Sequence, residues 1–157
     1  MDSGNIGFVL LCAAFVFVMT PGLAMFYGGL VRKKNVVNTM MTSIFIIGIG
    51  IVMWVLFGYS LSFAPSGNAF IGDFRWLGLE GVSLTEGYTD DASIPNMVFS
   101  AFQMMFAVIT PALITGAVAG RMKFKSIFVF TIFWSLIVYY PLAHMVWNGG
   151  LLSADGA

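Results

Sequence analysis

The sequence NVVNTMMTSIFIIGIGIVMWVLFGYSLSFAPSGNAFIG, residues 35–72, contains no Asp, Glu, Lys or Arg. Three further charge-free stretches cover residues 3–31, 92–120 and 126–154. Each is long enough to cross a hydrocarbon core of about 30 Å, which takes roughly 20 helical residues. Barrel strands would alternate apolar and polar residues, and these stretches do not. Because peptide groups in lipid must be hydrogen-bonded within the protein, the stretches predict an all-α polytopic membrane protein.

We expect four transmembrane helices at about 6–31, 39–63, 95–120 and 126–148, with a long loop at 64–94. The composition agrees, since 59% of the residues are hydrophobic and 9% are charged, against about 25% charged in a typical soluble domain. The long loop carries its own apolar patch, which could lie along the membrane interface or pack on the helix ends. The patch consists of Phe74, Trp76, Leu77 and Leu79.

The charges are distributed unevenly, although the formal net charge is zero. Six of the seven basic residues lie in two short loops, at 32–34 and 121–125, that contain no acidic residue. All the acidic residues and Arg75 lie elsewhere. Basic residues in short loops mark the cytoplasmic side, so we expect the N-terminus, the loop 64–94 and the C-terminal end of the fourth span to lie outside.

The spans offer little for catalysis, because they hold no charged residue, one cysteine and one histidine. No H-E-x-x-H, C-x-x-C, phosphate loop or G-x-S-x-G motif is present. Intramembrane charges usually mark proton relays and ion sites, so a pump driven by intramembrane carboxylates is disfavoured in this stretch. We expect a protein that is not an enzyme.

The most distinctive side chains in the spans are aromatic. Phe102 and Phe106 are four residues apart and share one helical face, and Trp147 lies near the outer end of the fourth span. One interpretation is ordinary, since Trp gathers at membrane interfaces and Phe commonly faces lipid. The other is an aromatic site for a cation, which aromatic faces attract by up to about 2 kcal/mol when water is excluded. The spacing alone does not choose between them. His144, one turn before Trp147, is interpreted as a hydrogen-bonded structural group, with proton transfer as the alternative.

Three segments together resemble the ammonium transporter family (Amt/Mep/Rh), and most closely its Amt branch. They are MTPGLAMFYGGLVRKKN at 19–35, AFQMMFA at 101–107 followed by Ile109 and Thr110, and YPLAHMVWNGGLL at 140–152. The resemblance covers essentially the whole chain in order. It implies that residues 1–157 are the N-terminal part of one ammonium transporter membrane domain, which in the family is an eleven-helix, inverted-repeat fold assembled as a homotrimer.

By the same resemblance, Trp147, Phe106 and Phe102 are substrate-binding residues, and Phe106 is also the outer pore gate. The family recruits ammonium at this site by cation–π contact, removes its proton and passes ammonia through an apolar pore. His144 matches neither of the family's pore histidines, and Asp155 is out of register for the family's site-organising Asp. Because those histidines lie on later helices, we expect residues 1–157 alone to be inactive and the sequence to be truncated.

The implied partners are ammonium or ammonia and the lipid bilayer of the cell membrane, with a possible cytoplasmic regulatory protein and no nucleic acid. No cofactor and no metal are implied. Alternatives remain open: a membrane ammonium-sensing domain of a signalling protein, a non-conducting subunit that joins a complete trimer, and a Rh-type gas channel.

Overall fold

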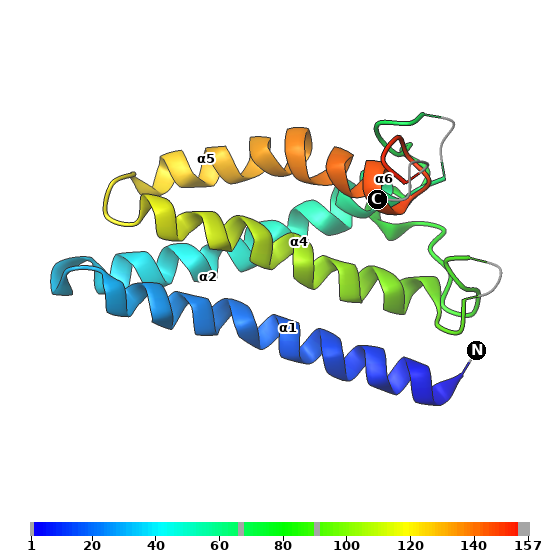
Figure 1. The fold of residues 1–157 in the computed structure, drawn as a ribbon, viewed down its shortest axis with the longest axis horizontal. Helices are drawn as coiled ribbons and strands as arrows, with labels where there is room; N and C mark the ends of the chain where they lie inside the picture. The colour runs from blue at the N-terminus through cyan, green and yellow to red at the C-terminus, as the bar shows by residue number, and fades with distance from the viewer. Residues whose placement is uncertain (1, 66–67, 90–91, 154–157) are drawn as a thin grey trace.

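Four long helical rods lie side by side in the computed structural model, which describes residues 2–65, 68–89 and 92–153 (Figure 1). The rods span Ser3–Leu30, Lys33–Phe63, Asn96–Val118 and Phe124–Trp147, and all four are long and apolar enough to cross a membrane. The predicted all-helical class with four membrane-spanning helices is therefore confirmed.

The first rod is the single helix α1 (Ser3–Leu30), which begins at the N-cap residue Asp2 and continues through Pro21. The second rod starts with a 3₁₀ turn, η1 (Lys33–Asn35), and continues as α2 (Val36–Met53), a π-helical turn η2 (Trp54–Gly58) and α3 (Tyr59–Phe63). The third rod is α4 (Asn96–Val118). The fourth consists of α5 (Phe124–Trp134), a second π-helical turn η4 (Ser135–Tyr139) and α6 (Tyr140–Trp147).

The two π-helical turns were not predicted from the sequence, and they lie where the second and fourth rods approach each other. Gly58, the last residue of η2, packs against the ring of Tyr140, the first residue of α6. A Cβ on Gly58 would lie 2.7 Å from Tyr140 Cζ. The absent side chain therefore allows the contact, as small residues do between membrane helices.

The buried core is concentrated in the half of the bundle that contains α3 and α6. Its members are Met53, Trp54, Tyr59, Leu61, Phe63, Val82, Ala107 and Tyr140. Trp54 is anchored on α4, because its Nε1 donates to the carbonyl of Ser100 at 3.2 Å. This aromatic packing fixes the ends of three rods relative to one another.

The apolar patch of the long loop packs on the helix ends with two of its four residues. Trp76 packs on the helix end, where its ring stacks on Tyr59 with centroids 5.5 Å apart and planes at 14°. Leu79, the last residue of the short 3₁₀ turn η3 (Leu77–Leu79), also contacts the core. Phe74 and Leu77 are instead exposed, which suits a loop face directed away from the bundle.

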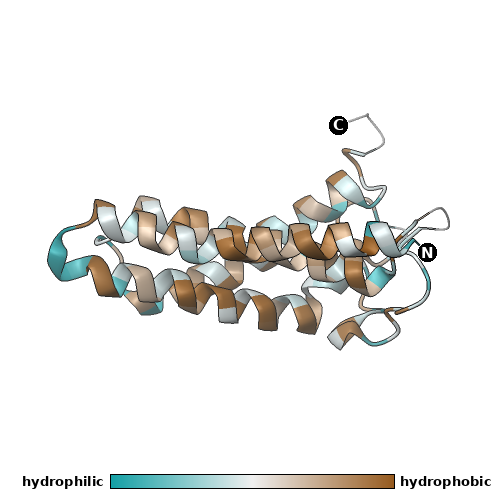
Figure 2. Cartoon of the chain, turned by 90° about the horizontal axis from the view of Figure 1, so that it is seen from below, coloured by the Kyte–Doolittle hydropathy of each residue, from teal (hydrophilic) through white to brown (hydrophobic). Residues whose placement is uncertain are grey.

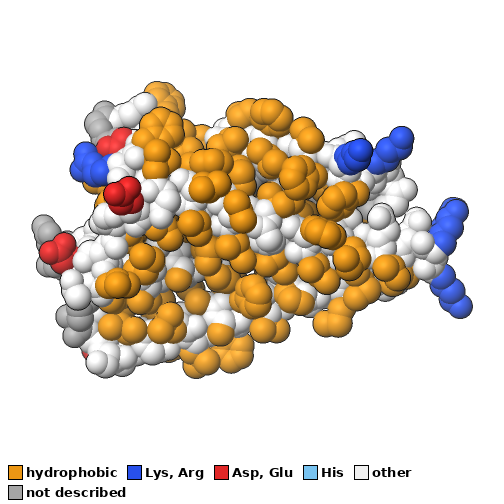
Figure 3. Space-filling model, turned by 180° about the vertical axis from the view of Figure 1, so that it is seen from behind, with side chains coloured by type: hydrophobic (Ala, Val, Ile, Leu, Met, Phe, Trp, Pro, Cys, Tyr) orange, Lys and Arg blue, Asp and Glu red, His pale blue; other side chains and the backbone are white. Residues whose placement is uncertain are grey.

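Hydropathy and charge both follow the long axis of the molecule. The rods are mainly hydrophobic; one end carries a strongly hydrophilic loop, and the loops at the other end are of mixed hydropathy (Figure 2). Figure 3 shows most of the Lys and Arg side chains gathered at one end, and the Asp and Glu side chains at the other together with one basic side chain. At the acidic end Arg75 pairs with Asp73, with 3.2 Å between Nη2 and Oδ2. Asp90, Asp91 and Asp155 lie outside the described residues.

A substitution at Gly72 tests how the long loop is attached to the second rod. Gly72 donates its N–H to the carbonyl of Leu61 at 2.7 Å, and a Cβ there would lie 2.4 Å from the carbonyl oxygen of Ser60. Because backbone atoms cannot move aside as a side chain can, Gly72→Ala should lower the free energy of unfolding by about 1–2 kcal/mol. The measurement is thermal unfolding of the purified protein in detergent.

The matched control is Gly48→Ala, since a Cβ at Gly48 would meet no atom within 4 Å. This change should leave the protein as stable as before or more stable, because glycine is unfavourable inside a helix. Equal melting temperatures for the two variants would show that the loop does not depend on the close approach at Gly72.

Candidate functional site

Aromatic rings from three rods and the long loop gather at the acidic end. The central ring is Phe63, the last residue of α3. Trp147 lies parallel to it at a centroid distance of 6.5 Å with planes at 7°, and Phe99 of α4 meets it edge-on at 5.1 Å and 88°. Tyr88 of the loop stacks on Phe99 at 4.6 Å. Trp147 keeps 56% of its surface exposed, so its ring remains accessible to a ligand.

Phe102 and Phe106 form a pair on α4, as their spacing predicts. Their centroids lie 5.1 Å apart with the planes at 77°, an edge-to-face contact. Both side chains are half-buried. Thr110, the next residue along this face, donates its hydroxyl to the carbonyl of Phe106 at 2.6 Å. This bond links the threonine to the carbonyl of Phe106 within the same helix.

The structure therefore places the three predicted site residues in two groups. Phe102 and Phe106 contact each other, while Trp147 contacts Phe63. Among the described residues, no ring contact joins Trp147 to either member of the pair. Phe63 and Phe99 are the aromatic residues that sequence reasoning missed. The contact of Phe63 with Trp147, and of Phe99 with Phe63, could be found only from the fold.

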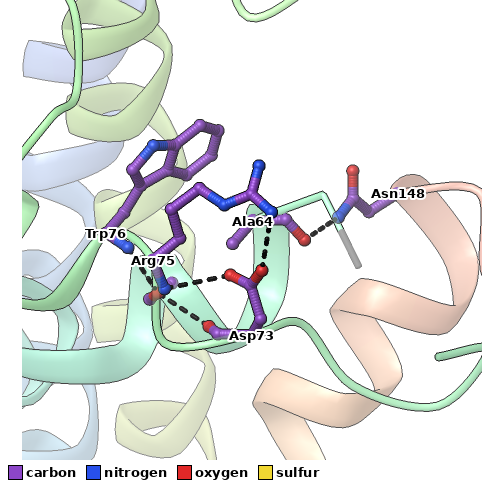
Figure 4. Close-up of polar contacts among 6 residues, drawn as sticks. Ala64, Asp73, Arg75, Trp76 and Asn148 are labelled. Carbon is purple, nitrogen blue, oxygen red and sulfur yellow. Dashed lines mark hydrogen bonds and ion pairs between the residues drawn. The ribbon is translucent and has the colours of Figure 1, made fainter. Parts of the chain in front are cut away.

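Asn148 is the polar residue that ties this end of the molecule together. Its Nδ2 donates to the carbonyl of Ala64 at 2.9 Å, a contact drawn in Figure 4. Nδ2 also lies 3.1 Å from His144 Nδ1, and Asn148 Oδ1 accepts from the hydroxyl of Tyr88. One side chain thus joins the C-terminal end of α6 to the end of α3 and to the loop.

Both ring nitrogens of His144 are held by polar contacts. Nδ1 lies 3.1 Å from Asn148 Nδ2 and 3.3 Å from the carbonyl oxygen of Ser62. Nε2 lies 3.0 Å from the carbonyl oxygen of Asn68. His144 is 1% exposed, and these contacts give it a structural role as a link between α6 and the long loop.

Tyr88 supplies the matching donor from the loop. Burial raises the pKa of Tyr88 to about 12, because the apolar surroundings disfavour the phenolate. The hydroxyl consequently stays protonated at neutral pH and donates to Asn148. The phenol ring is held at the same time by its stacking on Phe99.

A second polar cluster fixes the loop beside Trp76, and Figure 4 shows its members. Ser60 donates its hydroxyl to the carbonyl of Asp73 at 2.8 Å and accepts from the N–H of Trp76 at 3.0 Å. The carboxylate of Asp73 accepts from the N–H of Arg75 at 2.9 Å. The loop is therefore positioned by hydrogen bonds as well as by apolar packing.

Over the residues that the structure describes, no three His, Cys, Asp or Glu side chains come together in a group that could hold a metal ion. The chemistry that the site offers is instead that of aromatic faces, amide groups and carboxylates at one end of an apolar bundle.

Comparison with known proteins gives a consistent result. A sequence model described as the Ammonium Transporter Family matches residues 7–157. An ammonium transporter of Bacillus subtilis is 49% identical over the whole chain, which corresponds to 38% of that protein. One from Aquifex aeolicus is 42% identical, and the match covers 37% of it. The chain thus spans well under half the length of these relatives.

Solved structures give the same picture. Mep2 of Saccharomyces cerevisiae superposes with a TM-score of 0.86 at 34% identity, covering all of this chain and 35% of that one. Mep2 of Candida albicans gives a TM-score of 0.86 at 29% identity, covering 99% of this chain and 34% of that one. A structure named "Sensor Amt Protein" gives 0.85 at 24% identity, covering 96% and 37%, and shows a shared fold alone.

Proposed function

The chain belongs to the ammonium transporter family, and from that premise we propose that it forms the outer recognition site and one wall of the pathway through which its protein carries ammonium or ammonia. It is a multi-pass membrane protein. The rest of the pathway belongs to the part of the relatives that this chain does not span. We further propose that the intact protein is a homotrimer, as the family resemblance implies.

The observation that carries the proposal is the accessible face of Trp147. Its ring is held parallel to Phe63, so a cation can approach the other face without displacing a core residue. An aromatic face attracts ammonium more strongly as water is excluded. The acidic end would also raise the local cation concentration. We assign this end to the outside, because the basic loops at the other end fit the cytoplasmic side.

The pair Phe102 and Phe106 suits the next step. An apolar constriction makes a bare ammonium ion costly, while neutral ammonia crosses more cheaply. Potassium cannot lose its charge, so removal of a proton from ammonium would act as the selectivity step. The site at Trp147 must hold ammonium only moderately, because conduction also requires release.

Phe106→Ala tests the gate assignment. If the ring of Phe106 narrows the pathway and excludes water, its removal admits water and lowers the free energy needed to bring a bare ion into the pathway by about 1 kcal/mol. Discrimination between ammonium and potassium should then fall roughly fivefold. Discrimination is measured as the inhibition of methylammonium uptake by each ion in cells that express the intact protein and lack their own carriers. Phe128→Ala, which removes an exposed ring on α5, is the control and should behave as the wild type.

The function itself is tested by growth on low ammonium in a strain without ammonium carriers. Expression of the intact protein should restore growth, and failure to do so at a verified level in the membrane would refute the transport proposal. A sensing role would use the same outer site, and it would be indicated by ammonium-dependent signalling without uptake.

A further inference from the structure

A pocket of about 290 Å³ opens at the acidic end, beside Trp147 but distinct from its exposed face. It lies between the long loop and the ends of α3, α4 and α6. The residues that give it its chemistry are Phe63, Trp76, Glu86, Tyr88, Asn96 and Asn148. Three of these are aromatic and one is a carboxylate.

The aromatic walls are held by residues behind them. Trp76 stacks on Tyr59 at 5.5 Å, and Tyr88 stacks on Phe99 at 4.6 Å. Phe63 is 1% exposed and is supported edge-on by Phe99. Because these rings are already positioned, a ligand would not have to order them, which reduces the entropy lost on binding.

The backbone around the polar part of the pocket is fixed by hydrogen bonds, and the side chain of Glu86 is exposed. The N–H of Glu86 donates to Ser83 Oγ at 2.9 Å, and its carbonyl accepts from the N–H of Asn96 at 2.8 Å. Asn96 is 5% exposed, and its Oδ1 accepts from the hydroxyl of Tyr59. Each amide oxygen has two lone pairs, so the Oδ1 atoms of Asn96 and Asn148 can each accept one further hydrogen bond.

This combination selects a small cation that can donate hydrogen bonds. Aromatic faces and a carboxylate favour positive charge, and no Lys or Arg lines the pocket in the described part of the chain. An ammonium ion can donate N–H bonds to Glu86 and the amide oxygens while resting on an aromatic face. An alkali cation has no hydrogen to donate and gains only the electrostatic part.

We propose that this pocket is a second binding site for ammonium and small alkylammonium ions, placed before the Trp147 site. The two sites share Phe63, which lines the pocket and lies parallel to Trp147, and they share Asn148, which follows Trp147 directly. Because Phe63 is 1% exposed, an ion would move from the pocket to the exposed face of Trp147 without resting on the Phe63 ring. The inference rests on the proposed function for the identity of its ligand.

The test is fluorine NMR of the intact protein labelled with 5-fluorotryptophan in lipid nanodiscs. The fluorine signal of Trp76 reports on the pocket, and that of Trp147 reports on the exposed face of its own ring. Each signal is assigned as the one that disappears when that tryptophan is replaced by Phe. Ammonium chloride should shift both signals saturably, whereas potassium chloride at equal ionic strength should leave the Trp76 signal nearly in place. Methylammonium should act as ammonium does.

Glu86→Gln should weaken the response of Trp76 to ammonium about tenfold, because it removes one charge-assisted hydrogen bond, and should leave the titration of Trp147 unchanged. Glu80→Gln is the matched control, since Glu80 belongs to the same loop but does not line the pocket, and it should alter neither titration. The signal of the buried Trp54, at its wild-type position, verifies the fold of each variant.

The outcomes separate the second site from the proposed function. Equal responses of Trp76 to ammonium and potassium, or equal effects of Glu86→Gln and Glu80→Gln, would overturn the proposal of a binding site in the pocket. The responses would then reflect only a general attraction of cations to the acidic end. A response at Trp76 without one at Trp147 would support the pocket and contradict recruitment at Trp147. If ammonium shifted neither the Trp76 signal nor the Trp147 signal, both proposed ammonium sites would be overturned.

Discussion

Trp147→Leu in the intact protein is expected to raise the ammonium concentration for half-maximal uptake by up to about 30-fold. The estimate follows from the loss of a cation–π contact of up to about 2 kcal/mol, with a tenfold change for each 1.4 kcal/mol. The effect should be smaller if water reaches the bound ion, because Trp147 is 56% exposed. Concentration-dependent uptake of labelled methylammonium, competed with ammonium, measures the change.

The control for this prediction is Trp134→Leu. Trp134 ends α5 and contacts Tyr139, so its loss removes a ring of the same size from a different place. It should leave the half-saturating concentration unchanged. If Trp147→Leu also left the half-saturating concentration unchanged, with a normal amount of the variant protein in the membrane, Trp147 would be an interfacial anchor of the kind common in membrane proteins.

Asn148→Ala is expected to produce the largest loss of stability, about 3–4 kcal/mol in the free energy of unfolding. The change removes the partner of the Tyr88 hydroxyl, of the Ala64 carbonyl and of His144 Nδ1. A hydrogen bond contributes about 1 kcal/mol, and leaving a buried partner unsatisfied costs about 1–3 kcal/mol. Denaturant unfolding followed by tryptophan fluorescence provides the measurement.

Asn5→Ala is the matched control, because Asn5 is exposed and makes a single side-chain hydrogen bond, to Ser93 Oγ at 3.0 Å. Its effect should be within about 0.5 kcal/mol of zero, as for most surface substitutions. A loss for Asn148→Ala no greater than this would mean that α6 is held to the loop and α3 by apolar packing alone.

The helical class of the protein could be predicted from the sequence, because the absence of charge over four long stretches leaves few alternatives in a bilayer. The turns η2 and η4 could not be predicted. Gly58 carries no local signal for a π-helical turn, and its role depends on Tyr140, which is distant in the chain. The position of Trp76 on Tyr59 likewise depends on how the loop folds back over α3.

The candidate site divides in the same way. The contact between Phe102 and Phe106 follows from helical spacing, so local reasoning could predict it. The contacts of Trp147 and Asn148 join residues about 60 to 85 positions apart, which periodicity cannot reveal. His144 could be interpreted as structural from the sequence, yet its partners on the loop required the three-dimensional arrangement.

Methylammonium uptake into liposomes that contain the purified intact protein tests the proposed transport most directly. We expect saturable uptake above that of protein-free liposomes, competed by ammonium and not by potassium, and weakened by Trp147→Leu as described. Uptake equal to that of protein-free liposomes, from protein verified as folded and inserted, would contradict the proposed transport.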